Sequence, residues 1–508
     1  NDTEFNFVQG TGFATPQFRF LNSAAVISGG GDGPSEYNMA SVFGRATHSW
    51  NDRLTTTLNF RADASSRFGE NNRWGFFPSA SVLFRPGLEA LSGARVSDLA
   101  LRASYGLTGN QEGLGNFAAL GLFSGGASYG DRGGLAPSQL PNPDLSWEKT
   151  TQLNLGGDVA FFDDRVGLTF DWYHKNTTDL LLARPLPRST GYSGVTENIG
   201  AMTNSGVELA LRAQLVRSAE RSGFNWTSEL NVSTNRNKVT RLYGGQPIAQ
   251  GLSSTVRIEE GQPLGIFYGY VADDLFRSAG EICMDETGVQ CLANGTAFQR
   301  DADLGDVRFR DVGSFNEKGE IVAVPDGIIN SADRTRIGSP WADYQGGWTN
   351  TLSFRGVDLL AFLQFSQGND VFNGMRFYYD NPGFSGDNLR AYVLDRYSAE
   401  NPDGTHPRVS IADPNNNGRA SSRFVEDGSY VRLKNVVLGY TVPQSFSGRM
   451  GFNRLRVYVQ GQNLATWTDY SGFDPEVNFA GDNSVTRGYD FYTLPQSRTI
   501  SVGLDLGL

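Results

Sequence analysis

The chain has 508 residues, of which 39% are hydrophobic, 12% are aromatic and 62 are glycine. Its formal net charge of -11 argues against nucleic acid as a partner, because a surface that binds nucleic acid is basic. No segment of the sequence approaches the 18 or more apolar residues that a membrane-spanning helix requires. The chain is therefore either soluble or crosses a membrane as a closed β-barrel, in which every backbone polar group is paired.

Apolar residues recur at every second position along nearly the whole chain, which is the pattern of β-strands. Near the C-terminus, for example, Ile500, Val502 and Leu504 lie on one face and Ser501 and Asp505 on the other. In chain order, the pattern predicts strands near residues 17–28, 38–50, 53–63, 75–85, 98–108, 150–161, 165–175, 205–216, 223–234, 343–355, 357–367, 429–441, 454–463 and 498–508. Each run is about 10 residues long, the length that a tilted strand needs to cross a bilayer.

The links between these strands alternate in length. Short or moderate links follow one strand of each pair, at 51–52, 86–97, 163–164, 217–222, 355–356 and 442–453. Long links follow the other strand, at 109–149, 176–204, 235–342, 368–428 and 464–497. Tight turns at one rim and long loops at the other are typical of outer-membrane barrels, whose short turns face the periplasm. This pattern predicts an all-β, antiparallel transmembrane barrel whose C-terminus is periplasmic.

The segment 235–342 is too long for a loop without secondary structure, so it is predicted to contain short strands within a large extracellular region. Both cysteines of the chain, Cys283 and Cys291, lie in this segment. A disulfide that closes a loop is expected between them in an oxidising compartment. A metal site on these thiols is not expected, because no histidine or further cysteine lies nearby.

No constellation of catalytic residues is found in the sequence. The three histidines, His48, His174 and His406, are far apart and fit neither a metal motif nor a catalytic triad. Paired carboxylates and a nucleophile with an adjacent base are not found either, so we do not expect an enzyme.

Several local strings are more specific than the strand period. They are DASSRFGENNRWGFFPSA (63–80), LRASYGLTGNQ (101–111), NPDLSWEKTTQ (142–152), NSGVEL (204–209), GDVRFRD (305–311), VEDGSYVRLKN (425–435) and QNLATWTDYSGFDPE (462–476). In this order they resemble the SusC/RagA family of TonB-dependent outer-membrane transporters.

The resemblance implies a 22-stranded barrel that is plugged by an N-terminal domain. It also implies a surface-exposed SusD-like lipoprotein that acts as a lid, and energy from the TonB complex through an N-terminal TonB box. The cargo of such systems is usually a glycan and sometimes a peptide. The plug and the TonB box are not seen in residues 1–508, and we count about 14 or 15 strands, so we expect the C-terminal part of such a barrel.

One acidic turn resembles the Asp-rich turn that many members of this family carry. Its residues are Asp311, Asp326, Asn330 and Asp333, with an insertion, 312–325, between the first two. Calcium takes six to eight oxygen ligands, which carboxylates and carbonyls supply. A bound cation at these four residues is one prediction, and a hydrated acidic turn without a cation is the alternative.

Aromatic residues gather in or beside the predicted extracellular loops. Trp467, Tyr470, Phe473, Tyr378 and Tyr379 are candidates for contact with cargo or with the lid, because aromatic faces stack on sugar rings and other apolar surfaces. The alternative for each residue is packing within a loop or in the aromatic girdle that lines both rims of such barrels.

We therefore predict an energy-coupled importer in the bacterial outer membrane, in contact with lipid, a lid lipoprotein and the TonB complex. Two alternatives remain open at this point. One is a passive porin or channel of about 14 strands, and the other is a structural or adhesive surface protein that uses the barrel as a scaffold.

Overall fold

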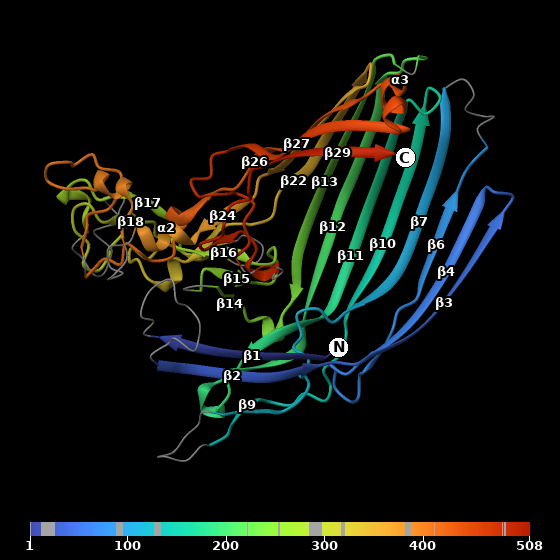
Figure 1. Cartoon of the computed structure of the whole chain (residues 1–508). Helices are drawn as coiled ribbons and strands as arrows, with labels where there is room; N and C mark the ends of the chain where they lie inside the picture. Colours follow the sequence, from blue (N-terminus) through green and yellow to red (C-terminus); the bar gives the residue numbers. More distant parts are fainter. Residues whose placement is uncertain are drawn as a thin grey trace. The chain divides into compact units, whose positions relative to one another are not determined.

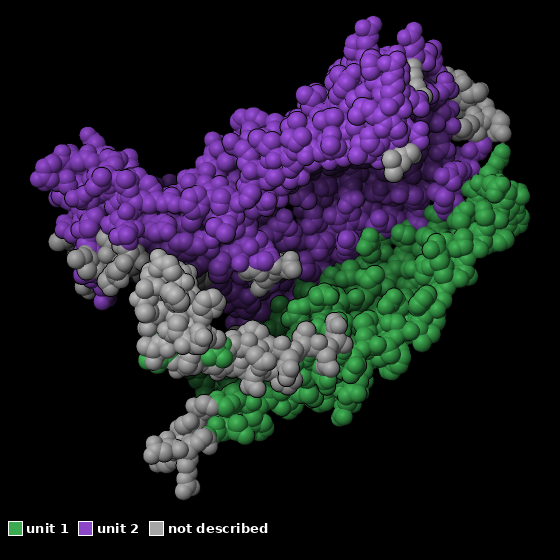
Figure 2. Space-filling view, in the orientation of Figure 1, with its two compact units in different colours: residues 1–82, 104–153, 176–201 green, residues 83–103, 154–175, 202–508 purple. Residues whose placement is uncertain are grey.

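The computed structural model describes residues 2–11, 26–87, 95–125, 134–220, 222–251, 254–283, 297–315, 321–380, 388–410, 412–479, 481 and 484–507. Among these, no helix is both long and apolar enough to cross a membrane. The chain divides into two compact units, coloured separately in Figure 2. Unit 1 comprises Asn1–Val82, Ser104–Leu153 and Asn176–Ala201, and unit 2 comprises Leu83–Ala103, Asn154–Lys175 and Met202–Leu508.

A 14-stranded sheet is the main element of the fold (Figure 1). Its strands are β3 (Met39–Trp50), β4 (Leu54–Ser65), β5 (Trp74–Phe76), β6 (Ser79–Phe84), β7 (Val96–Asn110), β10 (Glu148–Phe161), β11 (Val166–Pro185), β12 (Gly194–Val216), β13 (Asn225–Arg241), β22 (Tyr344–Phe354), β23 (Val357–Gln367), β26 (Tyr430–Thr441), β27 (Arg454–Thr468) and β29 (Thr499–Gly507). β5 pairs with β4, and the others are hydrogen-bonded in chain order from β3 to β29. This antiparallel arrangement confirms the predicted fold class.

Two strand predictions need correction. The strand predicted near 75–85 is broken into β5 and β6, because Pro78 has no N–H to donate to a ladder. The long link predicted at 176–204 is largely strand, because β11 and β12 continue to Pro185 and from Gly194. Arg184 and Glu197 form a bidentate ion pair across this extension, with N···O distances of 2.8 and 2.9 Å.

The N-terminal prediction falls mainly on undescribed residues. A strand was predicted near 17–28, and residues 12–25 lie outside the described part of the chain. Beyond them, β1 (Asp2–Thr11) and β2 (Val26–Glu36) form a separate two-stranded sheet.

The strands of unit 2 have one exposed apolar face and one polar face. On β29 the alternating residues Ile500, Val502 and Leu504 are exposed, and on β26, which has a partner on each side, Leu438 is 54% exposed. The polar face carries Asp358 of β23, which accepts a hydrogen bond from Arg456 of β27 at 2.9 Å. A soluble sheet would bury the apolar face against a core, whereas a sheet in a membrane turns it toward lipid.

A charged substitution should destabilise the protein on the apolar face of the sheet and be tolerated on the polar face. Leu438→Arg should lower the free energy of unfolding by about 1–3 kcal/mol, because it places a charge against lipid on a strand that crosses the bilayer. The matched control is Gln460→Arg, since Gln460 bonds to Asn435 on the polar face at 3.0 Å and should tolerate a charge. Denaturant unfolding in phospholipid vesicles measures both. Equal destabilisation by the two substitutions would contradict a lipid-facing Leu438.

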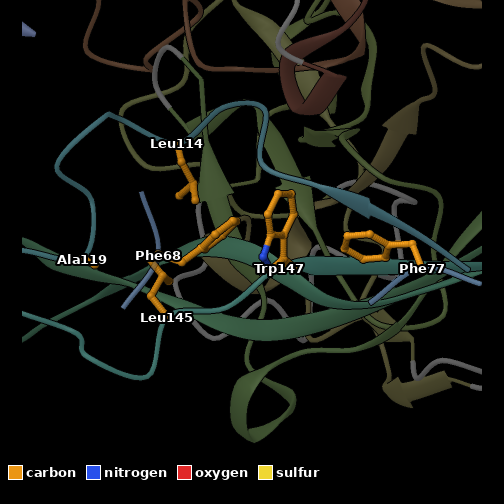
Figure 3. Close-up of a cluster of buried hydrophobic side chains, with 6 residues drawn as sticks. All are labelled: Phe68, Phe77, Leu114, Ala119, Leu145 and Trp147. Atoms are coloured by element: carbon orange, nitrogen blue, oxygen red, sulfur yellow. The ribbon is translucent and has the colours of Figure 1, made fainter. Parts of the chain in front are cut away.

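Unit 1 has its own hydrophobic cluster between the loops that follow β4 and β7. Its buried members, drawn in Figure 3, are Phe68, Phe77, Leu114, Ala119, Leu145 and Trp147. The Trp147 ring centre lies 4.5 Å from that of Phe68 and 5.4 Å from that of Phe77. Its indole N–H donates to the carbonyl of Arg73 at 3.0 Å. A short sheet of β8 (Leu122–Ser124) and β9 (Ala136–Gln139) also lies in this unit.

The long loops of unit 2 build an assembly of small sheets, at the end of β22 and β26 in Figure 1. Its elements are β14 (Ile248–Gln250), β15 (Val256–Ile258), β16 (Ile266–Gly269), β17 (Ala272–Leu275), β18 (Val307–Phe309), β19 (Ser314–Phe315), β20 (Ile321–Ala323), β21 (Thr335–Gly338), β24 (Asp370–Asn373), α2 (Gly374–Tyr379), β25 (Val425–Asp427) and β28 (Tyr489–Asp490). A core of buried residues, including Val256, Phe267, Phe372 and Phe424, holds β15, β16 and β24 together. A further short helix, α3 (Gln444–Ser447), lies between β26 and β27.

Candidate functional site

A pocket of about 780 Å³ lies in unit 2, between the polar face of the sheet and the loop 469–498. Its lining is rich in carboxamides and hydroxyls, with few charges. The lining includes Asn231, Gln345, Phe362, Gln364, Tyr430, Glu476, Asn478 and Arg487. Such a surface can both donate and accept hydrogen bonds, because each carboxamide has an NH₂ donor and a carbonyl acceptor.

Strand register places the polar side chains of the pocket wall. Gln345 of β22 lies opposite Ser233 of β13 and Ser366 of β23, and Gln364 lies opposite Gly347. Because Gly347 has no side chain, it leaves room for the Phe362 ring: a Cβ at this position would lie 2.5 Å from that ring. The Gln364 carboxamide donates to the Tyr430 hydroxyl at 3.1 Å, which orders the wall at the start of β26.

The loop 469–498 is fixed to the wall by a buried ion-pair network. The guanidinium of Arg432, with a side chain only 1% exposed, bonds to the Asp474 carboxylate. It also donates to Glu476 at 2.9 Å and to the Thr466 hydroxyl at 3.0 Å. Lys434 lies 3.2 Å from the same Glu476 carboxylate at the more exposed end of the network.

Backbone contacts and apolar packing complete this anchor. The Asp474 carboxylate accepts hydrogen bonds from the backbone N–H groups of Glu476 at 2.9 Å and Gln496 at 3.0 Å. Val371, Tyr470 and Val477 form a small buried cluster beside it. Burial raises the pKa of the Tyr470 phenol, and its hydrogen bond to Asp490 at 2.6 Å raises it further. These contacts join residues 470–477 of the loop to the wall of the pocket.

The predicted aromatic residues do not share one environment. Tyr470 is buried in the anchor just described. Tyr378 packs on Phe491, with ring centres 5.4 Å apart, and Tyr379 packs on Tyr492 at 5.8 Å. Phe473 is exposed, with the guanidinium of Arg390 5.8 Å from its ring centre. Contact of any of them with cargo or lid stays a prediction.

Trp467 lies on the apolar face of the sheet. It is 57% exposed and is paired in register with Val431. Its neighbour Thr466 is on the opposite side, where it bonds to Arg432. Exposure on the apolar face fits the alternative prediction of an aromatic residue in the rim girdle, and both this role and contact with cargo or lid stay predictions.

The acidic turn brings Asp311 and Asp333 together through backbone hydrogen bonds. Asp333 accepts from the N–H groups of Asn330 at 2.7 Å and Val312 at 3.3 Å, and Asp311 accepts from Gly327. Asp326 caps the N–H of Ile328 at 2.9 Å. Within the described residues, no three His, Cys, Asp or Glu side chains gather closely enough to hold a metal ion. A cation bound with the help of Asn330 and backbone oxygens stays a prediction.

The two carboxyl groups predict a pH dependence of this turn. Burial raises the pKa of Asp333 from 3.8 to about 6, and the adjacent Asp311 adds to the rise. Because the pKa in the folded turn is above its ordinary value, folding favours the protonated form. The resulting stability is complete below about pH 4 and is lost as the pH rises through about 6. Hydrogen exchange of the Asn330 and Val312 amides, corrected for intrinsic rates, should therefore be slower at about pH 5 than at about pH 7.

The substitution Asp333→Asn should remove this pH dependence and serves as the control. Calcium added at about pH 7 tests the predicted cation in the same assay, because it should slow exchange in the unmodified turn and not in the variant. Equal protection at both pH values in the unmodified protein would contradict the raised pKa.

Cys283 is disulfide-bonded and buried. Its predicted partner, Cys291, lies outside the described residues.

The pocket-lining residues were not identified from the sequence. A signal for Gln364 was present, because it alternates with the apolar residues Leu363 and Phe365 and so had to face the interior. No sequence signal shows that Glu476 and Arg487 of the loop reach the same place, since that depends on the ion pair with Arg432.

Comparison with known proteins gives a consistent result. The family model described as "TonB dependent receptor-like, beta-barrel" matches residues 2–464. The chain is 33% identical over 506 residues to TonB-dependent receptor P3 of Formosa agariphila, which covers 96% of this chain and 47% of that protein. It is 28% identical over 495 residues to TonB-dependent receptor SusC of Bacteroides thetaiotaomicron, which covers 92% of this chain and 43% of that protein.

A solved structure of the RagAB peptide transporter has the same fold. It superposes with a TM-score of 0.78 at 26% identity, over 99% of this chain and 52% of that chain. The chain thus spans about half the length of the relatives it matches. These matches confirm the resemblance to the SusC/RagA group.

Proposed function

This chain belongs to the family of TonB-dependent receptor-like β-barrels of the outer membrane, and from that premise we propose that it forms part of an energy-coupled nutrient importer. The observation that carries the proposal is the contrast between the two faces of its sheet. The apolar face is exposed, as lipid contact requires, and the opposite face forms a polar pocket of about 780 Å³. A hydrophilic solute can therefore be received on the side of the wall that does not face lipid.

The partners and the orientation belong to the same proposal. The assembly of small sheets faces outside, beneath a SusD-like lipoprotein lid, and the short turns and the C-terminus face the periplasm. The TonB complex acts through the N-terminal part of the protein, ahead of this barrel portion. The similarity to SusC and to RagAB supports this arrangement, as does the anchoring of the loop 469–498 to the wall by Arg432.

The cargo is a glycan or a peptide. The carboxamides of Asn231, Gln345, Gln364 and Asn478 suit both, because sugar hydroxyls and peptide groups each donate and accept hydrogen bonds. Phe362 and Tyr430 add apolar surface against which a sugar ring or a side chain can pack.

A transport measurement tests the proposal. The double substitution Gln345→Ala/Gln364→Ala in the protein in its native membrane should lower cargo uptake by about 30-fold, because two uncharged hydrogen-bonding groups that contribute about 1 kcal/mol each are removed. The matched control is Gln460→Ala, which lies on the same face outside the pocket lining. Uptake should also stop when the proton gradient is collapsed.

Two outcomes would overturn the proposal. Uptake that continues without a proton gradient would indicate a passive channel. Loss of surface attachment without any loss of uptake, after the gene is deleted, would indicate an adhesive protein.

A further inference from the structure

A second pocket lies on the four-stranded sheet β14–β15–β16–β21 of the loop assembly, of which Figure 1 labels β14, β15 and β16. One face of this sheet is buried, since Val256, Ile258 and Phe267 have almost no exposed surface. The opposite face presents Arg257, Tyr268 and the arginines of the β21 segment. In the register, Ala249 lies opposite Arg257, and Tyr268 lies opposite Arg336.

On this second face is a pocket of about 260 Å³, lined by Pro247, Ala249, Ser254, Arg257, Tyr268 and Arg334. Two guanidinium groups lie beside one aromatic ring there. That of Arg257 is 4.0 Å from the Tyr268 ring centre, and that of Arg334 is 5.2 Å from it. Arg334 is held in place by its hydrogen bond to the carbonyl of Ser254 at 2.9 Å.

The pocket has more positive than negative charge. Glu259 pairs with Arg257 at 3.1 Å. In the described part of the chain, neither Arg334 nor Arg336 has a carboxylate within ion-pair distance, and Arg336 donates only to the Gln262 carboxamide at 3.4 Å. This excess of positive charge occurs in a chain whose net charge is -11. The Tyr268 hydroxyl is a hydrogen-bond donor at neutral pH, as any phenol is, and burial raises its pKa further.

We propose that this pocket binds a carboxylate group on the molecule that the receptor imports. The proposal rests on the import function above and adds a chemical class to its cargo. A planar guanidinium offers a carboxylate two parallel N–H donors, and a pair of arginines supplies the charge that a desolvated anion needs. The volume is just below the usual range of ligand pockets, so it accepts one sugar-sized or amino-acid-sized unit of a larger cargo. A uronic acid unit and the acidic end or side chain of a peptide share this chemistry.

Binding of small probes to the purified protein tests the pocket. Glucuronate is compared with glucose, and N-acetylglycine with its amide, by calorimetric titration or saturation-transfer NMR. We expect at least one acidic probe to bind about tenfold or more tightly than its neutral partner, with a Kd that rises with salt concentration. Arg334→Gln should remove most of this preference, whereas Arg334→Lys, which keeps the charge, should retain part of it.

The matched control is Arg310→Gln, because Arg310 belongs to the same loop assembly but is paired with Asp273 at 2.7 Å outside the pocket. It should leave probe binding unchanged. Equal affinity for acidic and neutral probes, or an Arg334→Gln variant that binds the acidic probe like the unmodified protein, would overturn the proposal. Uptake of neutral cargo should persist in Arg334→Gln, so failure here is distinguishable from failure of the import function.

Discussion

Replacement of Arg432 by methionine should lower the free energy of unfolding by about 3–5 kcal/mol, because it leaves the buried Asp474 carboxylate without its cation. The Asp474 side chain is only 6% exposed, and Arg432 is its sole ion-pair partner within the described residues. Lys434 cannot take over, since it pairs with Glu476 instead. The loop 469–498 should therefore detach from the wall, and the pocket should lose one side.

Two measurements test for the loss of stability and for the detachment of the loop. Denaturant unfolding in vesicles gives the change in free energy, and limited proteolysis reports exposure of the segment between Pro475 and Gly488. The matched control is Lys434→Gln, which removes the more exposed cation of the same network and should cost about 1 kcal/mol or less. A double variant, Arg432→Met/Asp474→Asn, should recover part of the loss because the orphaned charge is gone. If Arg432→Met and Lys434→Gln cause the same loss of stability and the same proteolysis, the buried ion pair does not anchor the loop.

The strands were predictable because their signal is local. A residue that faces lipid is apolar, and its neighbours in sequence face the other way. The alternation of Ile500, Val502 and Leu504 with polar residues therefore predicts a strand without information from the rest of the chain. The extension of β11 and β12 past residues 175 and 205, where the predicted strands end, lacked this signal. There the strands are held by cross-strand contacts between polar residues, such as Arg184 with Glu197, whose alignment is set only once the hairpin forms.

The site was harder to predict because its parts are distant in sequence. Tyr470 and Trp467 are three residues apart, yet one is buried beneath the loop and the other is exposed on the apolar face. The register between β26 and β27 shifts between Leu433 and Asn435, and Asn463 on the facing strand has a positive φ of 53°. On β26 this irregularity reverses which positions face outward, since Leu438 lies on the apolar face on one side of it and Val431, the partner of Trp467, lies on that face on the other side. A strict period-2 pattern cannot reveal this reversal. The pocket itself depends on the contact of Arg432 with Asp474, 42 residues away.

The buried cluster in unit 1 explains why two of the sequence strings that resemble the family contain large aromatic residues. The strings 63–80 and 142–152 meet there, so Phe68 and Phe77 of the first enclose Trp147 of the second (Figure 3). Gly69 donates its N–H to the carbonyl of Leu145 at 3.0 Å. A Cβ at Gly69 would lie 1.9 Å from the carbonyl oxygen of Pro143, so the close approach of the two strings requires glycine at this position.

Trp147→Ala should therefore lower the free energy of unfolding of the protein by about 3–5 kcal/mol, the range for large buried aromatic residues. The side chain is 4% exposed, and its removal leaves a cavity between Phe68 and Phe77. It also removes the donor to the Arg73 carbonyl. Trp147→Phe should cost less than Trp147→Ala, because it removes the same hydrogen bond but keeps an aromatic ring and therefore most of the packing between Phe68 and Phe77.

The matched control for Trp147→Ala is Trp74→Ala, which removes the same side chain from the same unit at a position 61% exposed. Its cost should be much smaller, because the loss of stability scales with the apolar area that folding buries. Denaturant unfolding followed by tryptophan fluorescence, together with proteolysis of the loops around residues 69 and 143, measures both variants. If Trp74→Ala destabilises the protein as much as Trp147→Ala, packing between the two strings does not hold these loops together, and their pairing must depend on the hydrogen bonds between them, which include those from the Asn71 and Asn72 side chains to Asp144.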